Sequence, residues 1–428
     1  MNITLQPYKV AGSLAAPASK SVMQRACAAA LLFNGTTLIN NYGQSNDDKA
    51  ALDMIQVAGA TVKYLSAHQL EIRANGTVAH PRNARYNCGE SGLSLRMFTP
   101  IIALGKNAAN IAGQGSLLKR PVHFFEEILP LLGVQVKAAQ GSLPLQIQGP
   151  LLPADIAIDG SLTSQFLTGL LMAYSASGRQ ANLAVKNLAS KPYVDVTLAV
   201  MEAFGMNMPV NDNYEHFSFR ATKKQTPRTV TFDVGGDWSN AAFLLAAGAI
   251  GGALQLKGLD VFSEQADKKI LEALQQCGCQ LSIETEAITV ANNGSLQPIH
   301  IDATHCPDLF PPLVALAAYA NGTSVIEGVH RLRHKESNRA LALQQEWAKF
   351  GLEISFQDDA MIIKPPTEIS PASIHSHNDH RIAMAAAVTA CKATGPVTIE
   401  HAEAVKKSYP DFFEDLQQIA IIEAPWKQ

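Results

Sequence analysis

The chain has 428 residues, which is too long for one ordinary hydrophobic core, so we expect two domains. Its apolar fraction of 47% and charged fraction of 17% are those of a packed globular protein and exclude a largely disordered one. The net charge of -3 argues against a broad nucleic-acid-binding surface, which needs an excess of basic residues on one face. A local basic pocket is still compatible with that charge.

The cysteines and the apolar stretches bear on where the protein works. The six cysteines are scattered, mostly in apolar runs, which favours free thiols in a reducing compartment. The start, MNITLQPYKV, lacks the basic residues and apolar run of a signal peptide. The longest weakly polar stretch, 241–256, is too short to span a membrane. We therefore expect a cytoplasmic protein with no membrane partner.

A glycine that closes an apolar helical stretch recurs along the chain at intervals of 74, 72, 73 and 73 residues. A glycine in that position supplies a left-handed helix end. Alternating runs follow, such as 60–74, 279–291 and 352–365, and they predict a pair of strands each time. The stretch 411–420 resembles the helix of a sixth, truncated copy. The glycines are Gly59, Gly133, Gly205, Gly278 and Gly351.

Six copies predict two domains of three, with a boundary near residues 222–235, where the stretch 221–229 is polar and contains a proline. A cleft between two similar domains is a preferred place for a small-molecule site. A purely structural repeat protein is the alternative, but solenoid repeats have shorter periods of roughly 20–50 residues.

Cations and hydroxyl groups recur at the predicted helix starts. Ser19 is a predicted N-cap, and Pro121 and Pro192 are expected at first helical positions. Cations normally favour helix C-termini, so their repeated presence at N-termini indicates convergence on strongly anionic ligands. In chain order, the residues are Lys20, Ser21, Arg25, Arg120, Thr163, Ser164, Gln165, Ser190, Lys191, Arg333, Lys335, Arg339, His380, Arg381, Lys406 and Lys407.

Carboxylates are few among these motifs. Asp308 precedes an apolar helix, so it is either a plain N-cap or a functional group. Glu336 either pairs with Arg339 three residues later or acts chemically. Asp379 is a predicted helix cap. One or two carboxylates in a cation-rich pocket suit proton transfer on a polyanionic substrate.

Metal and nucleotide cofactors find no support. The histidines of HSHNDHR (375–381) do not have the spacing of a helical His-x-x-x-His ligand pair. Neither a phosphate-binding G-x-x-x-x-G-K-[ST] loop nor a G-x-G-x-x-G dinucleotide fingerprint occurs. We expect no cofactor and no metal.

Seven motifs in order resemble the family of 5-enolpyruvylshikimate-3-phosphate (EPSP) synthases, also called 3-phosphoshikimate 1-carboxyvinyltransferases. They are PASKSVMQR, DGSLTSQFLTGLLMA, SKPYVDVT, PDLFPPLVALAA, RLRHKESNR, NDHRIAMA and KKSYPDFFEDL. The resemblance implies an α/β (α+β) enolpyruvyl transferase fold of two similar domains, each of three βαβαββ units. It also implies that the first strand joins the C-terminal lobe, which gives 14–232 for one domain and 1–13 with 233–428 for the other.

The resemblance further implies enolpyruvyl transfer from phosphoenolpyruvate to the 5-hydroxyl of shikimate 3-phosphate, in aromatic amino acid biosynthesis, with release of phosphate. Asp308 would be the base for the 5-hydroxyl, Glu336 would protonate the methylene carbon, and Lys20 would also be catalytic. Shikimate 3-phosphate would contact Lys20, Ser21, Arg25, Thr163, Ser164, Gln165, Ser190, Asp308 and Lys335. Phosphoenolpyruvate would contact Lys20, Gly92, Arg120, Gln165, Arg339, His380, Arg381 and Lys407. A monomer is the expectation for the oligomeric state.

The chain departs from the family in the segment GESGLSLR (89–96), where Glu90 and Leu93 replace a usual Asn and Thr. The departure bears on the shape of the phosphoenolpyruvate pocket. UDP-N-acetylglucosamine enolpyruvyltransferase is a rival, but its cysteine before the Arg-Pro motif is missing from GQGSLLKRP (113–121). A non-catalytic anion-binding repeat protein is the other alternative; it predicts missing carboxylates, whereas Asp308 and Glu336 are present.

Overall fold

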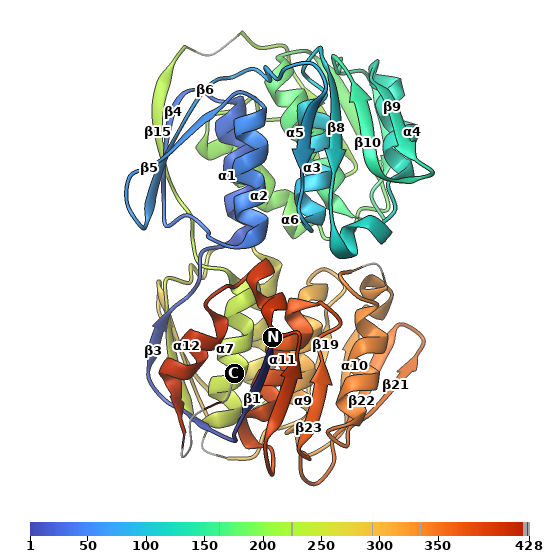
Figure 1. The fold of residues 1–428 in the computed structure, drawn as a ribbon. Coiled ribbons are helices and arrows are strands. Elements are labelled where there is room, and N and C mark those ends of the chain that lie inside the picture. The colour runs from blue at the N-terminus through green and yellow to red at the C-terminus, as the bar shows by residue number, and fades with distance from the viewer. Residues whose placement is uncertain (162, 224–225, 293, 334, 423–425, 427–428) are drawn as a thin grey trace. The chain divides into compact units, whose positions relative to one another are not determined.

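The computed structural model describes residues 1–161, 163–223, 226–292, 294–333, 335–422 and 426 (Figure 1). The chain divides into two compact units. The N-terminal unit is Ala18–Gly235, and the C-terminal unit is Met1–Pro17 with Gly236–Gln428. Each unit contains a hydrophobic core of its own.

Within the described residues, the N-terminal unit contains three four-stranded sheets of one topology, in which a parallel pair is followed by two antiparallel strands. The first sheet has the order β15 (Arg228–Asp233), β4 (Asn34–Asn40), β6 (Gln69–Asn75) and β5 (Thr61–Tyr64). The second has the order β7 (Ala84–Asn87), β8 (Ala108–Ala112), β10 (Ser142–Gln148) and β9 (Gln135–Ala139). The third has the order β11 (Ile156–Asp159), β12 (Ala181–Lys186), β14 (His216–Phe219) and β13 (Val210–Asp212).

The C-terminal unit repeats this topology. One sheet has the order β3 (Ser13–Ala15), β16 (Ala253–Lys257), β18 (Ala287–Ala291) and β17 (Gln280–Ile283). Another has the order β19 (His300–Asp302), β20 (Ser324–Glu327), β22 (Ala360–Lys364) and β21 (Glu353–Gln357). The third has the order β23 (Ala372–His375), β24 (Val397–Glu400) and β1 (Asn2–Leu5). A short pair joins β2 (Lys9–Val10) to β25 (Ala420–Ile421).

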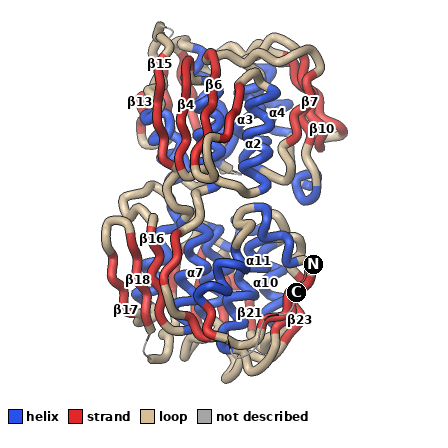
Figure 2. Tube along the Cα trace, turned by 60° about the vertical axis from the view of Figure 1, so that its left-hand side comes forward, coloured by secondary structure: helices blue, strands red, loops and turns tan. Residues whose placement is uncertain are grey.

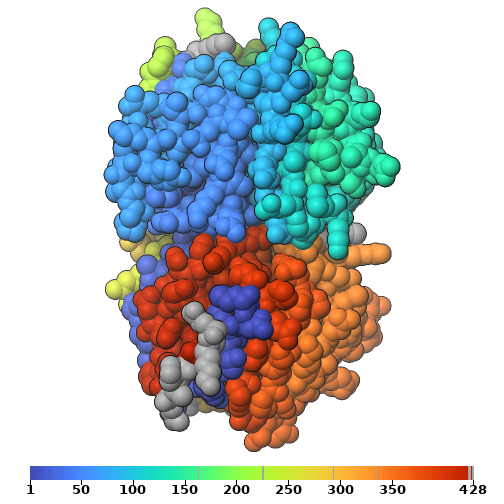
Figure 3. All heavy atoms as spheres, in the orientation of Figure 1, coloured from blue at the N-terminus to red at the C-terminus, as the bar shows by residue number. Residues whose placement is uncertain are grey.

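The three-stranded sheet explains why the sixth copy looks truncated in the sequence. Its antiparallel third strand is β1, which comes from the start of the chain and pairs with β24 in register Asn2 to Glu400 and Leu5 to Val397. Figure 3 shows the N-terminal atoms of this unit surrounded by residues from the C-terminal end. The sixth copy therefore takes a strand from a distant segment.

The helices form the interior of each unit, and the strands lie on the outside (Figure 2). Every residue of α3, α7, α9 and α11 is buried, and most of these residues are apolar. The helices of the N-terminal unit are α1 (Lys20–Leu32), α2 (Asn46–Val57), α3 (Gly92–Ile102), α4 (His123–Ile128), α5 (Ser164–Ser177) and α6 (Pro192–Ala203). Those of the C-terminal unit are α7 (Trp238–Gly251), α8 (Ile270–Gln276), α9 (Phe310–Ala317), α10 (Arg339–Ala348), α11 (His380–Thr389) and α12 (Phe412–Ile419).

The repeated glycines have the predicted conformation. Their φ angles are +108° at Gly59, +79° at Gly133, +59° at Gly205, +80° at Gly278 and +96° at Gly351. An antiparallel strand pair follows each of them: β5/β6, β9/β10, β13/β14, β17/β18 and β21/β22. Because residues with a Cβ reach this left-handed region only at a cost, the sequence period marks the helix ends reliably.

One predicted helix start is confirmed in position, at Ser19, and another, at Pro121, is wrong. Ser19 occupies the N-cap position of α1, but its side chain makes no capping hydrogen bond; its backbone N–H donates to the Gly235 carbonyl oxygen at 2.8 Å. Pro121 is not the first helical residue, because Val122 has a non-helical φ of -128° and α4 begins at His123. Pro192 does begin α6, as expected. No helix among the described residues has both the length and the apolar character needed to cross a membrane.

Candidate active site

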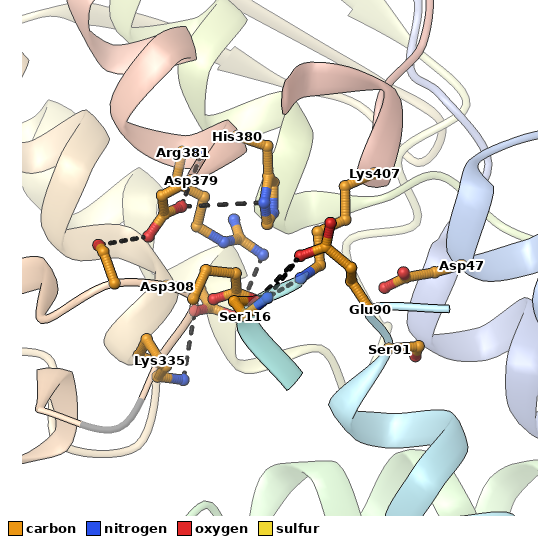
Figure 4. Close-up of polar contacts among 12 residues, drawn as sticks. Asp47, Glu90, Ser91, Ser116, Asp308, Lys335, Asp379, His380, Arg381 and Lys407 are labelled. Carbon is orange, nitrogen blue, oxygen red and sulfur yellow. Dashed lines mark hydrogen bonds and ion pairs between the residues drawn. The ribbon is translucent and has the colours of Figure 1, made fainter. Parts of the chain in front are cut away.

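Asp308 lies at the centre of a cluster of cations in the C-terminal unit. It belongs to the 3-10 turn Pro307–Leu309, immediately before α9. Its Oδ1 accepts a hydrogen bond from Arg339 Nη1 at 2.8 Å. Its Oδ1 also accepts one from Lys335 Nζ at 3.3 Å, and its Oδ2 accepts one from Arg381 Nη2 at 3.1 Å (Figure 4). The plain N-cap alternative is wrong, because the N-cap of α9 is Leu309.

Two helix starts place the guanidinium groups of this cluster. Arg339 is the first residue of α10, and Arg381 lies in the first turn of α11. Asp379 caps α11 by accepting the Arg381 N–H at 3.0 Å, and it also accepts hydrogen bonds from Arg339 Nε at 3.0 Å and Nη2 at 3.2 Å. The sequence predicted only the cap, so it missed that the same carboxylate holds Arg339.

Glu336 extends the cluster. Its Oε2 accepts a hydrogen bond from Arg339 Nη2 at 2.8 Å, which is the i,i+3 pair considered in the sequence. Its Oε1 lies 3.4 Å from Lys407 Nζ, at the end of the 3-10 helix Ala402–Lys407. Beside it, the fully buried His380 has its Nδ1 3.8 Å from Asp379 Oδ1. Arg339 therefore touches three carboxylates, those of Asp308, Glu336 and Asp379.

The charges of the cluster perturb one another. Burial alone would raise the pKa of Asp308, but Arg381, Lys335 and Arg339 hold that pKa well below its usual range. Burial would lower the pKa of Arg339, whereas Asp379, Glu336 and Asp308 together raise it. Burial lowers the pKa of Lys335. Asp308 is therefore ionised at neutral pH and able to accept a proton.

In the N-terminal unit, Lys20 and Arg25 lie on α1 and contact different partners. Lys20 Nζ pairs with Asp47 Oδ2 at 3.0 Å, a carboxylate that the sequence did not single out. Arg25 donates from Nε to Thr197 Oγ1 at 2.9 Å and from Nη1 to the Ser21 carbonyl oxygen at 2.8 Å. Burial lowers the pKa of Arg25 to about 10. Neither Lys20 nor Arg25 is therefore an ordinary solvated surface charge.

The start of α5 is built as the sequence predicts. Thr163 caps the helix by accepting the Gln165 N–H at 3.2 Å, and Ser164 is the first helical residue. Gln165 Oε1 accepts a hydrogen bond from Arg96 Nη1 at 2.9 Å, which adds a cation that the sequence reading missed. Ser190 precedes α6 with a left-handed φ of +58°.

Gly92 is the first residue of α3 and lies against two guanidinium groups. A Cβ built on Gly92 would clash with Arg120 Nη1 and would lie 3.0 Å from Arg96 Nη1. Two residues earlier, the Glu90 carboxylate accepts hydrogen bonds from the loop before Arg120, as the Glu90–Ser116 contact in Figure 4 shows. The segment 89–96, where the chain departs from the usual family motif, therefore contacts the predicted ligand Arg120.

His375 and His377 of the motif 375–381 contact Glu346 and other histidine rings. His377 Nε2 contacts Glu346 Oε1 at 2.8 Å, and the ring of His375 contacts those of His377 and His401. No group of three or more His, Cys, Asp or Glu side chains that could hold a metal ion occurs in the described part of the chain.

Comparisons with known proteins give one consistent result. The family model described as EPSP synthase (3-phosphoshikimate 1-carboxyvinyltransferase) matches residues 5–416. The 3-phosphoshikimate 1-carboxyvinyltransferase of Clostridium novyi (strain NT) is 33% identical over 433 residues, which cover 99% of both chains. That of Aeropyrum pernix is 34% identical over 421 residues, covering 97% of this chain and 95% of the relative.

Solved structures share the fold. An EPSP synthase structure from Acinetobacter baumannii aligns with a TM-score of 0.82 at 24% identity and covers 100% of both chains. The enolpyruvyl transferase NikO from Streptomyces tendae aligns with a TM-score of 0.77 at 16% identity over 99% of both chains. These likenesses confirm the fold class expected from the motifs.

Proposed function

Because this chain belongs to the EPSP synthase (3-phosphoshikimate 1-carboxyvinyltransferase) family, we propose that it transfers the enolpyruvyl group of phosphoenolpyruvate to the 5-hydroxyl of shikimate 3-phosphate and releases phosphate. The observation that carries the proposal is the cluster in which Asp308 and Glu336 share Arg339. It combines two carboxylates suited to proton transfer with cations suited to binding phosphate and carboxylate groups.

The substrates explain why so many cations start helices. Each substrate carries a carboxylate and a phosphate, and the phosphate alone contributes about two negative charges at neutral pH. Guanidinium groups suit such anions because they bind them in bidentate geometry. We assign to shikimate 3-phosphate the residues Lys20, Ser21, Arg25, Thr163, Ser164, Gln165, Ser190, Asp308 and Lys335. We assign to phosphoenolpyruvate the residues Lys20, Gly92, Arg120, Gln165, Arg339, His380, Arg381 and Lys407.

The proposed chemistry is addition followed by elimination. Asp308 accepts the proton of the 5-hydroxyl as its oxygen bonds to C2 of phosphoenolpyruvate, and Glu336 gives a proton to the methylene carbon C3. The product of this step is a tetrahedral ketal. The bond from C2 to the phosphate oxygen then breaks as phosphate leaves, the Glu336 carboxylate takes a proton back from C3, and the double bond of the enolpyruvyl group re-forms.

The cations around Asp308 set the basicity of its carboxylate. While Arg339, Arg381 and Lys335 hold its carboxylate, Asp308 has a low pKa and is a weak base. The anionic groups of phosphoenolpyruvate compete for Arg339 and Arg381 in this proposal. Their binding would weaken the hold on Asp308 and raise its pKa, so the base becomes effective only when the second substrate is present.

A phosphate-release assay tests the function. Phosphate should appear only when phosphoenolpyruvate and shikimate 3-phosphate are both supplied. Release that depends on UDP-N-acetylglucosamine instead would favour the rival transferase. No release with any acceptor would favour a non-catalytic anion-binding protein.

We also propose a cytoplasmic location and a monomeric state. The cysteines of the described chain are free thiols, which fits a reducing compartment. Light scattering on the eluate of a sizing column would test the oligomeric state against the chain mass of 45.8 kDa.

A further inference from the structure

The Glu90 carboxylate is hydrogen-bonded to a turn that ends at Arg120. Its Oε2 accepts two hydrogen bonds from one residue, the backbone N–H of Ser116 and the Ser116 hydroxyl, both at 3.1 Å. The preceding residue, Gly115, has a φ of +56°, and a Cβ built on it would lie 2.5 Å from both Glu90 carboxylate oxygens. The backbone of the turn therefore lies directly against the carboxylate, at a distance that excludes a side chain.

Backbone hydrogen bonds also join the segment before Glu90 to the segment before Ser116. Gln114 donates its N–H to the Gly89 carbonyl oxygen at 2.8 Å, and Cys88 donates to the Ala112 carbonyl oxygen at 2.8 Å. Ser116 lies in the 3-10 helix Gly115–Lys119, and the N–H of Arg120 donates to the Leu117 carbonyl oxygen at 3.1 Å. A hydrogen-bonded turn of a few residues thus joins the Glu90 contact to Arg120.

The other end of the same segment touches the Arg120 side chain. Gly92, two residues after Glu90, packs so closely on Arg120 Nη1 that a Cβ would clash with it. Arg120 is 8% exposed, so its guanidinium has little room to move. The segment 90–92 therefore constrains Arg120 from both directions, through the turn and through the guanidinium.

We propose that Glu90 is a positioning residue for Arg120: it anchors the Gly115–Lys119 turn through Ser116 and so fixes the guanidinium that binds phosphoenolpyruvate. The inference rests on the proposed function for the identity of that ligand. A carboxylate next to an anion-binding site would oppose binding unless its charge were engaged by donors. The two donors of Ser116 engage the carboxylate of Glu90.

The test compares Glu90→Ala and Glu90→Gln with Glu126→Ala. Glu126 is a matched control, because its carboxylate accepts one backbone N–H, that of Ala138 at 2.9 Å, elsewhere in the same unit. In Glu90→Ala we expect the KM for phosphoenolpyruvate to rise about tenfold or more, from the loss of charge-assisted hydrogen bonds. The Kd for shikimate 3-phosphate, measured by calorimetry, should stay within about twofold, which is an ordinary small effect of a distant change. Glu126→Ala should change neither quantity.

Glu90→Gln keeps the shape and one acceptor oxygen, so it should fold even if Glu90→Ala does not, and it should show a smaller rise in the same KM. Combining Ser116→Ala with Glu90→Ala should raise the KM for phosphoenolpyruvate little further, because both changes remove the same contact between Glu90 and Ser116. An unchanged KM for phosphoenolpyruvate in folded Glu90→Gln and Glu90→Ala would overturn the proposal. So would equal losses of affinity for both substrates.

Amide hydrogen exchange separates this inference from the proposed function, since it needs no turnover. The peptide covering residues 113–120 should exchange faster in Glu90→Ala than in the wild type, and Glu126→Ala should leave it unchanged. A wild-type protein that releases no phosphate would sink the proposed function, whereas unchanged exchange in this peptide would sink the anchoring role of Glu90.

Discussion

Arg339 and Asp379 form a bidentate ion pair: Arg339 Nε donates to Asp379 Oδ2 at 3.0 Å, and Nη2 donates to Oδ1 at 3.2 Å. Neither side chain is exposed to solvent. The same carboxylate accepts the backbone N–H of Arg381. One buried aspartate thus holds the guanidinium of Arg339 and caps the helix start that carries Arg381.

Removing that aspartate should cost stability. Asp379→Ala leaves the buried Arg339 charge without its main partner, so we expect the free energy of unfolding to fall by about 3–5 kcal/mol. Lys364→Ala is the control, because it breaks an exposed pair with Glu353, and solvent screening should keep its effect below about 1 kcal/mol. Urea titrations at neutral pH measure both. Equal losses in the two variants would contradict the importance of the buried pair.

Asp308→Asn should separate chemistry from binding. The amide keeps the size of the side chain but cannot accept the hydroxyl proton, so we expect kcat to fall by roughly 10²–10⁴-fold. Shikimate 3-phosphate should still bind measurably by calorimetry. The exposed Asp302, which accepts the Thr304 N–H at 2.9 Å, offers a control as Asp302→Asn, and that variant should retain normal turnover. Near-normal turnover of Asp308→Asn would remove Asp308 from the role of base.

Asp48 should make the free energy of unfolding depend on pH between acid and neutral conditions. Burial raises the pKa of Asp48 to about 7, against the hydrogen bonds of Ser45 that lower it. The pKa of Asp48 is higher in the folded state than in the unfolded state, so protonation of Asp48 favours folding. This contribution to the free energy of unfolding is fully present below the usual aspartate pKa of about 3.9 and is lost as pH rises through the folded-state pKa. Asp48→Asn carries no charge at any pH. Denaturant titrations from acid to neutral pH should therefore show a decline in the wild type that the variant lacks, and parallel profiles would refute the assignment.

Gly92→Ala should affect one substrate and spare the fold. The new Cβ would meet the ends of the Arg120 and Arg96 side chains and no backbone atom, so the clash displaces those guanidinium groups, and Gly92 has no left-handed φ that would strain an alanine. We expect the KM for phosphoenolpyruvate to rise about tenfold, which corresponds to about 1.4 kcal/mol of binding free energy. Gly322→Ala, where the added Cβ finds ordinary contact with Pro298, is the control and should leave the KM unchanged. An unaltered KM in Gly92→Ala would show that Arg120 tolerates the displacement.

The repeat and the helix starts could be predicted because their signals are local. A left-handed glycine after a helix has a steric cause that operates within a few residues, so Gly59 and Gly351 reveal their conformation without tertiary information. The predicted helix starts at Thr163–Gln165 and at Pro192 have equally local causes and are confirmed.

The parts that could not be predicted depend on long-range contacts. The cap signal of Asp379 is the same whether or not its carboxylate also holds Arg339, forty residues earlier in the chain. Asp47 looks like an ordinary first-turn acid of α2, which gives no sign of its pair with Lys20. Arg96 lies in an otherwise apolar helix, and its contact with Gln165 comes from a separate repeat.

The pairing of β1 with β24 and of β3 with β16 has a consequence for biosynthesis. Residues 18–235 are one uninterrupted stretch and can reach their native state soon after leaving the ribosome. Residues 1–17 are translated before this stretch, but β16, the partner of β3, follows it at residues 253–257, and β24, the partner of β1, comes only at residues 397–400. A nascent chain stalled after residue 235 should therefore contain a folded N-terminal unit, while residues 1–17 remain unpaired.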